Sequence, residues 1–146
     1  MRQIFLPFIV IIFFLFLNSC QKEKKENAYP IQPVPFTSVQ LTDDFWAPKI
    51  KRNHDVTIPI ALEKSRETGR IKNFKIAGGL EEGSFCTIYP FDDSDLFKII
   101  EGASYSLQMF PDPELEAYLD TLIHYIDLAQ EEDGYIYTNR TIMGDS

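Results

Sequence analysis

The sequence predicts an all-α fold built from helical hairpins, with one short strand near the start of the compact region. Residues 94–110 and 113–130 each carry apolar side chains at the three- and four-residue spacing that places them on one helix face. The turn between these two helices is so short that they must lie antiparallel. Each helix has more apolar surface than one partner helix can cover, which suits a layered or toroidal architecture of repeated helix pairs.

The N-terminus has the pattern of a bacterial lipoprotein signal. Residues 4–17 form an unbroken apolar run, which is shorter than the roughly 20 residues of a membrane-spanning helix and typical of a signal-peptide core. The run leads to Ser19-Cys20, and a small residue before cysteine is typical of a lipobox. We therefore predict a lipoprotein signal peptide over residues 1–20, with lipidation at Cys20. An ordinary secretion signal with an incidental cysteine is the alternative.

A lipid anchor would place the protein in the bacterial cell envelope, on the periplasmic or the cell-surface face. Residues 21–35 carry mixed charges and three prolines, which predicts a flexible tether between the membrane and the compact region. The domain that follows is expected to span residues 36–146.

Charge and cysteine content exclude some functions. Asp and Glu number 22 against 14 Lys and Arg, and the formal net charge of −8 disfavours a nucleic-acid partner. If Cys20 is lipidated, Cys86 has no disulfide partner within the chain. A lone cysteine after Phe85 is more often a buried small hydrophobe than a nucleophile. Cys86 and His54 together are too few ligands to predict a metal site.

The first half of the domain shows weaker patterns than the second. Residues 36–41 contain β-branched residues in alternation and predict the short strand. Side-chain oxygens of residues 42–44 can cap a helix that runs from about Trp46 to Glu67. Pro59 lies inside this helix, so we expect a kink or break near Thr57. Gly69 then ends the second piece, and the glycines between residues 78 and 83 indicate an irregular loop as far as Pro90.

Each of the two long helices has residues at its start that are typical of a helix N-terminus. Asp93 or Ser94 is expected to cap the first helix, and with Asp95 to favour its dipole rather than to form a catalytic carboxylate pair. Asp112 as the cap and Pro113 at the first helical position mark the second helix. Gly134 is expected to supply a positive backbone angle after it.

The loop after the second long helix is the best candidate for sugar contact. Its residues are Asp133, Tyr135, Tyr137 and Thr138. Tyrosine rings stack on sugar faces and hydroxyls bond to them, although tyrosines after such a glycine are as often ordinary rim packing. His54 and His124 lack a second histidine at ligand spacing and are expected to be partly exposed polar residues.

A series of short motifs along the chain resembles one enzyme family. In order, they are Val39-Gln40-Leu41-Thr42-Asp43 leading into Phe45-Trp46, Asn53 followed by Thr57-Ile58-Pro59, Asn73-Phe74-Lys75, Asp93-Ser94-Asp95-Leu96-Phe97-Lys98, Glu101-Gly102-Ala103, Asp112-Pro113-Glu114-Leu115 and Asp133-Gly134-Tyr135. Their order and approximate spacing resemble the N-terminal part of glycoside hydrolase family 127, the β-L-arabinofuranosidases. Each motif is weak alone, but together they are fairly specific over residues 39–138.

The resemblance implies an (α/α)6 barrel that cleaves non-reducing-end β-L-arabinofuranosyl linkages with retention. In that family a zinc-bound cysteine thiolate is the nucleophile and a glutamate is the acid and base. Those residues lie downstream in family members, and Cys86 matches none of them. We therefore expect no catalytic residue and no metal site in this chain, and zinc only in a full-length family member.

These observations predict the N-terminal fragment of a lipid-anchored glycosidase that acts on arabinose-containing plant-type glycans and is inactive by itself. Residues 141–146 show no closing helix and no capping signal, so we expect an incomplete fold. The alternative is a small envelope lipoprotein whose helical module binds glycans or a partner without catalysis. A different enzyme on the same toroid, such as an unsaturated uronyl hydrolase or a polysaccharide lyase, also stays open because fold does not fix reaction.

Overall fold

The structure, a computed structural model, describes residues 31–144. The predicted signal peptide with Cys20, and the tether up to residue 30, lie outside the described residues. Residues 31–35 are exposed and have no regular structure. The compact unit begins at Phe36.

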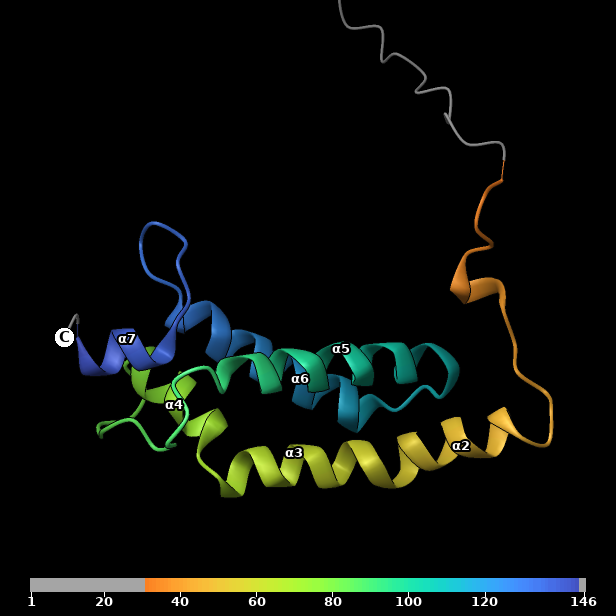
Figure 1. Cartoon of the computed structure of the whole chain (residues 1–146), viewed down its shortest axis with the longest axis horizontal. Coiled ribbons are helices and arrows are strands. Elements are labelled where there is room, and N and C mark those ends of the chain that lie inside the picture. The colour runs from red at the N-terminus through yellow and green to blue at the C-terminus, as the bar shows by residue number, and fades with distance from the viewer. Residues whose placement is uncertain (1–30, 145–146) are drawn as a thin grey trace, which may run out of the picture. The chain divides into compact units, whose positions relative to one another are not determined.

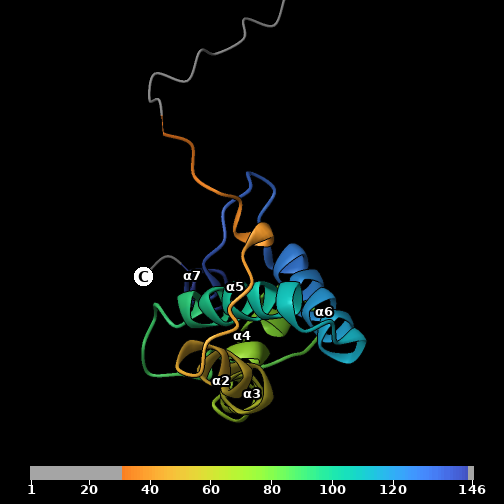
Figure 2. The same cartoon turned by 90° about the vertical axis from the view of Figure 1, so that its right-hand side faces the viewer.

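The compact unit is all-α, as predicted (Figure 1). Along the described part of the chain its elements are the 3₁₀ helix η1 (Phe36–Ser38), α2 (Trp46–Arg52), the π-helical segment η2 (Asn53–Thr57), α3 (Ile58–Glu67), α4 (Arg70–Ala77), α5 (Asp93–Met109), α6 (Pro113–Ala129) and α7 (Thr138–Met143). Helices α5 and α6 form the predicted antiparallel hairpin. Helix α2, η2 and α3 follow one another in a line, which we call the α2–α3 row, and this row packs beside the hairpin (Figure 2). No helix within residues 31–144 has both the length and the apolar character needed to cross a bilayer.

The strand predicted over residues 36–41 is wrong. Phe36–Ser38 forms a single 3₁₀ turn, closed by a bond from the Val39 N–H to the Phe36 carbonyl at 3.0 Å. The Phe36 ring packs edge-on against Tyr105 of α5, with centroids 5.1 Å apart. A strand needs a neighbouring strand for its backbone groups, and the described residues contain none.

The break predicted near Thr57 is confirmed and has a specific form. Within η2 the helix widens, and the Ile58 N–H bonds to the carbonyl of Asn53 five residues back. Pro59 lies in the first turn of α3. Because Pro59 lacks an N–H and its ring crowds the carbonyl four residues back, the normal ladder cannot continue through this point.

The predicted cap of the first helix is also confirmed. Asp43 accepts hydrogen bonds from the N–H groups of Phe45, at 2.8 Å, and Trp46. The bond from Trp46 is the main cause that lowers the pKa of the Asp43 carboxyl, because it favours the charged form.

His54 lies in the wide turn and is partly buried, which agrees with the expectation of a partly exposed residue. His54 Nδ1 lies 2.9 Å from the hydroxyl of buried Ser106, and the ring packs against Phe110 with centroids 5.0 Å apart. His54 therefore links the α2–α3 row to the end of α5, while His124 is exposed as expected.

Helix α4 is the centre of the core, although the sequence pattern did not predict it. It contacts α3, α5, α6 and α7, and its Phe74 side chain is fully buried. The apolar core contains residues from α3 to α6: Ile58, Leu62, Ile71, Phe74, Leu96, Ala103, Leu119, Leu122 and Ala129. Eight residues between two glycines give too short a periodic pattern for sequence analysis to separate from loop.

Gly69 permits a close approach between the α3–α4 turn and the loop before α5. Its φ is +86°, and a Cβ at this position would lie 2.5 Å from the Cβ of Cys86. The Asn73 side-chain oxygen holds this part of the loop by accepting the Cys86 N–H at 2.8 Å. The predicted helix end at Gly69 is confirmed, but Cys86 is exposed and not a buried hydrophobe as expected. The Cys86 Cβ lies against Gly69, and its backbone N–H is held by Asn73.

The start of α5 does not use the predicted side-chain cap. Asp92 occupies the cap position, and no side chain there bonds to the helix. The Asp93 carboxylate instead accepts two hydrogen bonds from Thr138, from the N–H at 2.8 Å and from the hydroxyl at 2.6 Å. Both residues are buried. This pair fixes α7 against α5, and α7 corrects the expectation that residues 141–146 carry no closing helix.

Helix α6 begins as predicted. The Asp112 carboxylate accepts the N–H groups of Glu114 and Leu115 at 3.0 and 3.1 Å, and Pro113 is the first helical residue. Gly134 has the predicted positive φ, at +90°. It lies in the loop beyond α6, where Gln130 Nε2 bonds to its carbonyl at 2.8 Å.

Substitution of Gly69 by alanine is expected to destabilise the domain. The left-handed backbone costs a non-glycine residue about 1–2 kcal/mol, and the clash with Cys86 adds roughly 1–3 kcal/mol of overpacking. Gly79→Ala is the matched control, because Gly79 also has a positive φ but nothing within 4 Å of the added Cβ. Urea unfolding should show a clearly larger loss for Gly69→Ala; equal losses would contradict the close approach.

Removal of the Asp93 carboxylate is expected to release α7. In Asp93→Ala the Thr138 N–H and hydroxyl lose their charged acceptor in a buried place, at a cost of about 2–4 kcal/mol. Asp120→Ala, which removes an exposed carboxylate from α6, is the control. Amide hydrogen exchange should accelerate across Thr138–Met143 in Asp93→Ala only, and unchanged protection there would contradict the role of this pair.

Candidate functional site

Three loop segments gather at one end of the α5–α6 hairpin, on the left in Figure 1. They are the α3–α4 turn at residues 68–70, the loop and helix start at residues 83–95, and the segment at residues 131–138. We call this region the loop end. The Asp93–Thr138 pair joins the second segment to the third, and the Asn73–Cys86 bond ties the second to α4. The candidate sugar-contact residues all lie here.

Arg70 organises the acidic start of α5. Its Nε lies 3.0 Å from the carboxylate of Asp95, and its Nη2 lies 3.4 Å from Oδ2 of buried Asp92. The contact with Asp92 is an ion pair without hydrogen-bond alignment, since this oxygen has no hydrogen-bond partner among the described residues. Arg70 Nη1 also donates to the Thr68 hydroxyl at 2.7 Å. The guanidinium thus holds the α3–α4 turn against the start of α5.

The carboxylates of this region are therefore structural. Asp92 and Asp95 pair with Arg70, Asp95 also lies 3.4 Å from Lys98 Nζ, and Asp93 binds Thr138. A general acid or base must reach a substrate proton, and Asp93 is enclosed within the protein. Neither Asp93 nor Asp95 caps the helix as predicted.

The structure divides the four predicted sugar-contact residues. Asp133 is exposed, and its carboxylate accepts the Tyr135 N–H at 3.0 Å, which shapes the turn. The Tyr135 ring is 44% exposed and lies 5.0 Å from the guanidinium carbon of Arg140. Tyr137 is half-buried, and Thr138 is buried with its hydroxyl bound to Asp93. Asp133 and Tyr135 are the two of these four residues that are exposed.

The loop before α5 exposes aromatic residues that sequence analysis did not single out. Tyr89 and Phe91 pack against each other with centroids 5.6 Å apart, and they are 51% and 66% exposed. Ile88 beside them is 85% exposed. Exposed apolar side chains next to the buried carboxylates of Asp92 and Asp93 reverse the usual distribution. The sequence gave no signal for this, because a loop has no periodicity that would assign its side chains to inside or outside.

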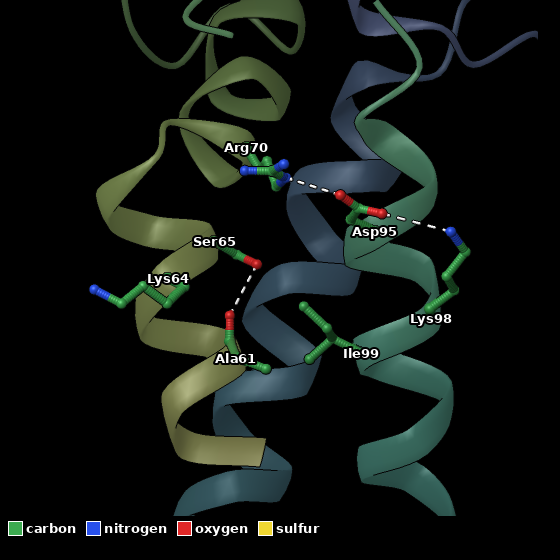
Figure 3. Close-up of a pocket in the computed structure, with 7 residues that line it drawn as sticks. All are labelled: Ala61, Lys64, Ser65, Arg70, Asp95, Lys98 and Ile99. Carbon is green, nitrogen blue, oxygen red and sulfur yellow. Dashed lines mark hydrogen bonds and ion pairs between the residues drawn. The ribbon is translucent and has the colours of Figure 1, made fainter. Parts of the chain in front are cut away.

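A groove of about 400 Å³ lies between α3 and α5 (Figure 3). It is lined by Ala61, Lys64, Ser65, Arg70, Asp95, Lys98 and Ile99. The figure shows Ser65 bonded to the Ala61 carbonyl, and Asp95 between Arg70 and Lys98. Its polar groups are thus already paired with one another. The lining offers no nucleophile beside a base, so the groove is not a catalytic constellation.

The described residues also provide no place for the zinc that the resemblance implies. Within residues 31–144 no three His, Cys, Asp or Glu side chains lie close enough together to hold a metal ion. Cys86 bonds only weakly, through its thiol, to the Ser84 carbonyl at 3.4 Å. A thiolate nucleophile held by zinc needs several ligands, so these residues do not fit the group.

Comparison with known proteins gives consistent matches. A family model described as β-L-arabinofuranosidase, GH127 catalytic domain, matches residues 38–144. A non-reducing end β-L-arabinofuranosidase of Bifidobacterium longum subsp. longum is 41% identical over 68 residues, which is 47% of this chain and 10% of that protein.

Two solved structures share the fold. A GH127 β-arabinofuranosidase is 49% identical with a TM-score of 0.71, over 78% of this chain and 18% of the other. A GH127 β-L-arabinofuranosidase from Geobacillus stearothermophilus T6 is 36% identical with a TM-score of 0.67, over 71% of this chain and 17% of the other.

The chain spans less than a fifth of the length of each of these relatives. The family match nevertheless covers nearly all of the compact unit. The all-α architecture agrees with a part of the toroid that the short motifs implied. The chain belongs to glycoside hydrolase family 127, the β-L-arabinofuranosidases, and corresponds to a part of its catalytic domain.

Proposed function

We propose that this chain forms the first helices of the catalytic domain of a glycosidase that releases non-reducing-end β-L-arabinofuranosyl units from plant-type glycans. The observation that carries the proposal is the family match over residues 38–144, supported by 49% identity and a TM-score of 0.71 to a solved relative. The whole activity then requires the part of the domain that this chain does not contain.

We also propose that the chain has no glycosidase activity by itself. Retaining hydrolysis needs a nucleophile on one side of the sugar and an acid and base on the other. The buried or ion-paired aspartates at the loop end cannot take these roles. Cys86, although exposed, has no base or metal ligand among the described residues to activate it.

The loop end is the part of this chain that we propose to face the glycan. Asp133 and Tyr135 are exposed on a turn that is fixed by hydrogen bonds on both sides. A rigid aromatic ring beside a carboxylate suits an arabinose unit, because the ring can cover an apolar sugar face while the carboxylate accepts hydroxyl hydrogens. Tyr137 supports the turn from its half-buried position.

We further propose that the protein is held at a membrane of the bacterial cell envelope by a lipid on Cys20. The support is the apolar run at residues 4–17 followed by Ser19-Cys20. The anchor and tether would place the helical unit at the membrane surface.

The anchor is tested by substitution of each cysteine in turn. Cys20→Ala should lose incorporation of a labelled fatty acid and move the protein from the membrane to the washable fraction in a bacterial host. Cys86→Ala, which removes the other cysteine, should keep both properties. Label that persists in Cys20→Ala, or disappears in Cys86→Ala, would show that the lipid site is wrong.

The catalytic role is tested with a chimera. Residues 38–144 replace the matching segment of the Geobacillus relative, and release of L-arabinose from an aryl β-L-arabinofuranoside is measured. We expect the chimera to keep activity within about tenfold of the intact relative, and the isolated chain to release none. Arabinose released by the isolated chain would disprove the proposal that the chain is inactive alone. A folded but inactive chimera would favour the alternative of a glycan- or partner-binding module without catalysis.

A further inference from the structure

An exposed surface at the start of the α2–α3 row combines aromatic and basic side chains. Phe45 and Trp46 are 60% and 56% exposed and pack edge to face, with ring centroids 5.0 Å apart. The Lys49 ammonium lies 4.2 Å from the centre of the Phe45 ring and 6.0 Å from that of Trp46. Lys49 and Arg52 also line an open groove of about 460 Å³, together with Pro48, Asn53 and Thr57. We call Phe45, Trp46, Lys49 and Arg52, with this groove, the α2 patch.

The two cations of the α2 patch have no carboxylate partner. Within residues 31–144 no Asp or Glu lies at ion-pair distance from Lys49 or Arg52. Asp55, the one acidic residue between Phe45 and Ile60, pairs with Lys51 instead. That stretch holds three basic residues, although acidic residues outnumber basic ones by 22 to 14 in the whole chain. The patch is therefore a locally basic surface on an acidic protein.

The groove also offers neutral polar groups for an anion. The side chains of Asn53 and Thr57 make no hydrogen bond within the part of the chain that the structure describes. Binding sites combine a shaped hollow with a few polar groups that are available to the ligand. Two cations with an amide and a hydroxyl beside them suit the oxygens of a phosphate group, because bonds between ionised partners are the strong ones.

The exposed aromatic rings indicate that this phosphate belongs to a lipid. A tryptophan ring has an apolar body and a polar N–H, and such rings are favoured at a membrane surface, where one end is apolar and the other wet. Basic side chains beside aromatic ones add attraction to anionic head groups. A soluble anion would bind to Lys49 and Arg52 but would leave Phe45 and Trp46 uncovered.

The sequence places the α2 patch within reach of a membrane. Cys20, which we propose to carry a lipid, is separated from Phe45 by 24 residues. Whatever their conformation, these residues limit the distance between Cys20 and Phe45 to at most about 90 Å. A surface held so close to its partner meets it at a high effective concentration, so a weak contact is sufficient.

We propose that the α2 patch docks on the anionic lipid surface of the membrane that holds the anchor. Phosphate head groups occupy the groove lined by Lys49 and Arg52, and the rings of Phe45 and Trp46 enter the interfacial layer. Helix α2 lies at the opposite end of the compact unit from the loop end (Figure 1). Docking through the patch therefore keeps the loop end, which we propose to face the glycan, away from the membrane. The inference rests on the proposed lipid anchor.

Trp46 reports on this contact directly, because it is the only tryptophan of the chain. The full chain is added to an excess of vesicles made of phosphatidylcholine alone or mixed with phosphatidylglycerol, with and without brominated acyl chains. We expect the Trp46 emission to shift to shorter wavelength, and brominated lipid to quench it, in the anionic vesicles only. High salt should reverse both changes, because it screens the attraction between exposed charges.

Arg52→Glu tests the groove without changing the aromatic cluster. Lys72→Glu is the matched control, because Lys72 is also an exposed cation on a helix, has no ion pair among the described residues and lies on α4 outside the patch. One basic residue near an anionic surface contributes roughly fivefold to binding, and reversal adds repulsion. We therefore expect Arg52→Glu to lower the ratio of docked to undocked Trp46 by about tenfold or more, and Lys72→Glu to leave it within about twofold. Circular dichroism checks that both variants keep their helices.

Several outcomes would overturn the inference. They are equal quenching of Trp46 in the two kinds of vesicle, no quenching in either, or equal effects of Arg52→Glu and Lys72→Glu. If inorganic phosphate perturbs the Arg52 side-chain resonance while vesicles leave Trp46 unchanged, the groove binds a free anion and the membrane is the wrong partner. Footprinting of the chimera in solution that finds Trp46 protected would place this surface inside the catalytic domain and also contradict the inference.

The lipid anchor is judged separately by incorporation of the labelled fatty acid into Cys20. The vesicle measurement reads the environment of Trp46 itself, so it gives a positive or a negative answer whether or not Cys20 carries a lipid. Loss of label in the Cys20→Ala variant together with unquenched Trp46 in the wild-type chain would leave the anchor in place and remove the docking surface.

Discussion

The structure depends on the buried carboxylate of Asp93 at the start of α5. A buried charge is costly unless hydrogen bonds replace its hydration. Thr138 provides two such bonds, from its N–H and its hydroxyl, and so joins segments 45 residues apart in sequence. This pair fixes the position of α7 and of the turn that carries Asp133 and Tyr135. Arg70 adds to it by binding Asp92 and Asp95 on either side.

The same region reverses the usual distribution of polar and apolar side chains. Asp92 and Asp93 are buried, while Ile88, Tyr89 and Phe91 a few residues earlier are exposed. Bonds to Asn73 on one side and to Arg70 and Thr138 on the other connect the residues that flank this apolar segment to the helices. Contiguous apolar surface of this kind usually meets a ligand or another protein surface. It agrees with a chain that forms part of a larger catalytic domain.

The described helices combine a buried core with surfaces that remain exposed. Phe74, Leu96 and Leu122 are fully enclosed, so the described helices have a hydrophobic centre of their own. The groove between α3 and α5 and the aromatic loop nevertheless lack cover. In a solved relative the matched region makes up only 18% of the chain. Uncovered surfaces of this kind agree with membership of a family whose matched domain is much larger than this chain.

The sequence by itself determined the α5–α6 hairpin, its Asp112 cap, the break at Pro59 and the family, because each depends on local patterning or on spaced motifs. It did not reveal α4, which is short and has no distinctive period, or α7, whose place depends on a bond to Asp93 from far along the chain. It also predicted a strand at residues 36–41, where the Phe36 ring packs on Tyr105 and no partner strand is present in the described part. Only the tertiary structure decided that Thr138 is buried, that Tyr135 is exposed and that Cys86 lies against Gly69. These outcomes depend on contacts between residues distant in sequence, and local propensity carries no information about such contacts.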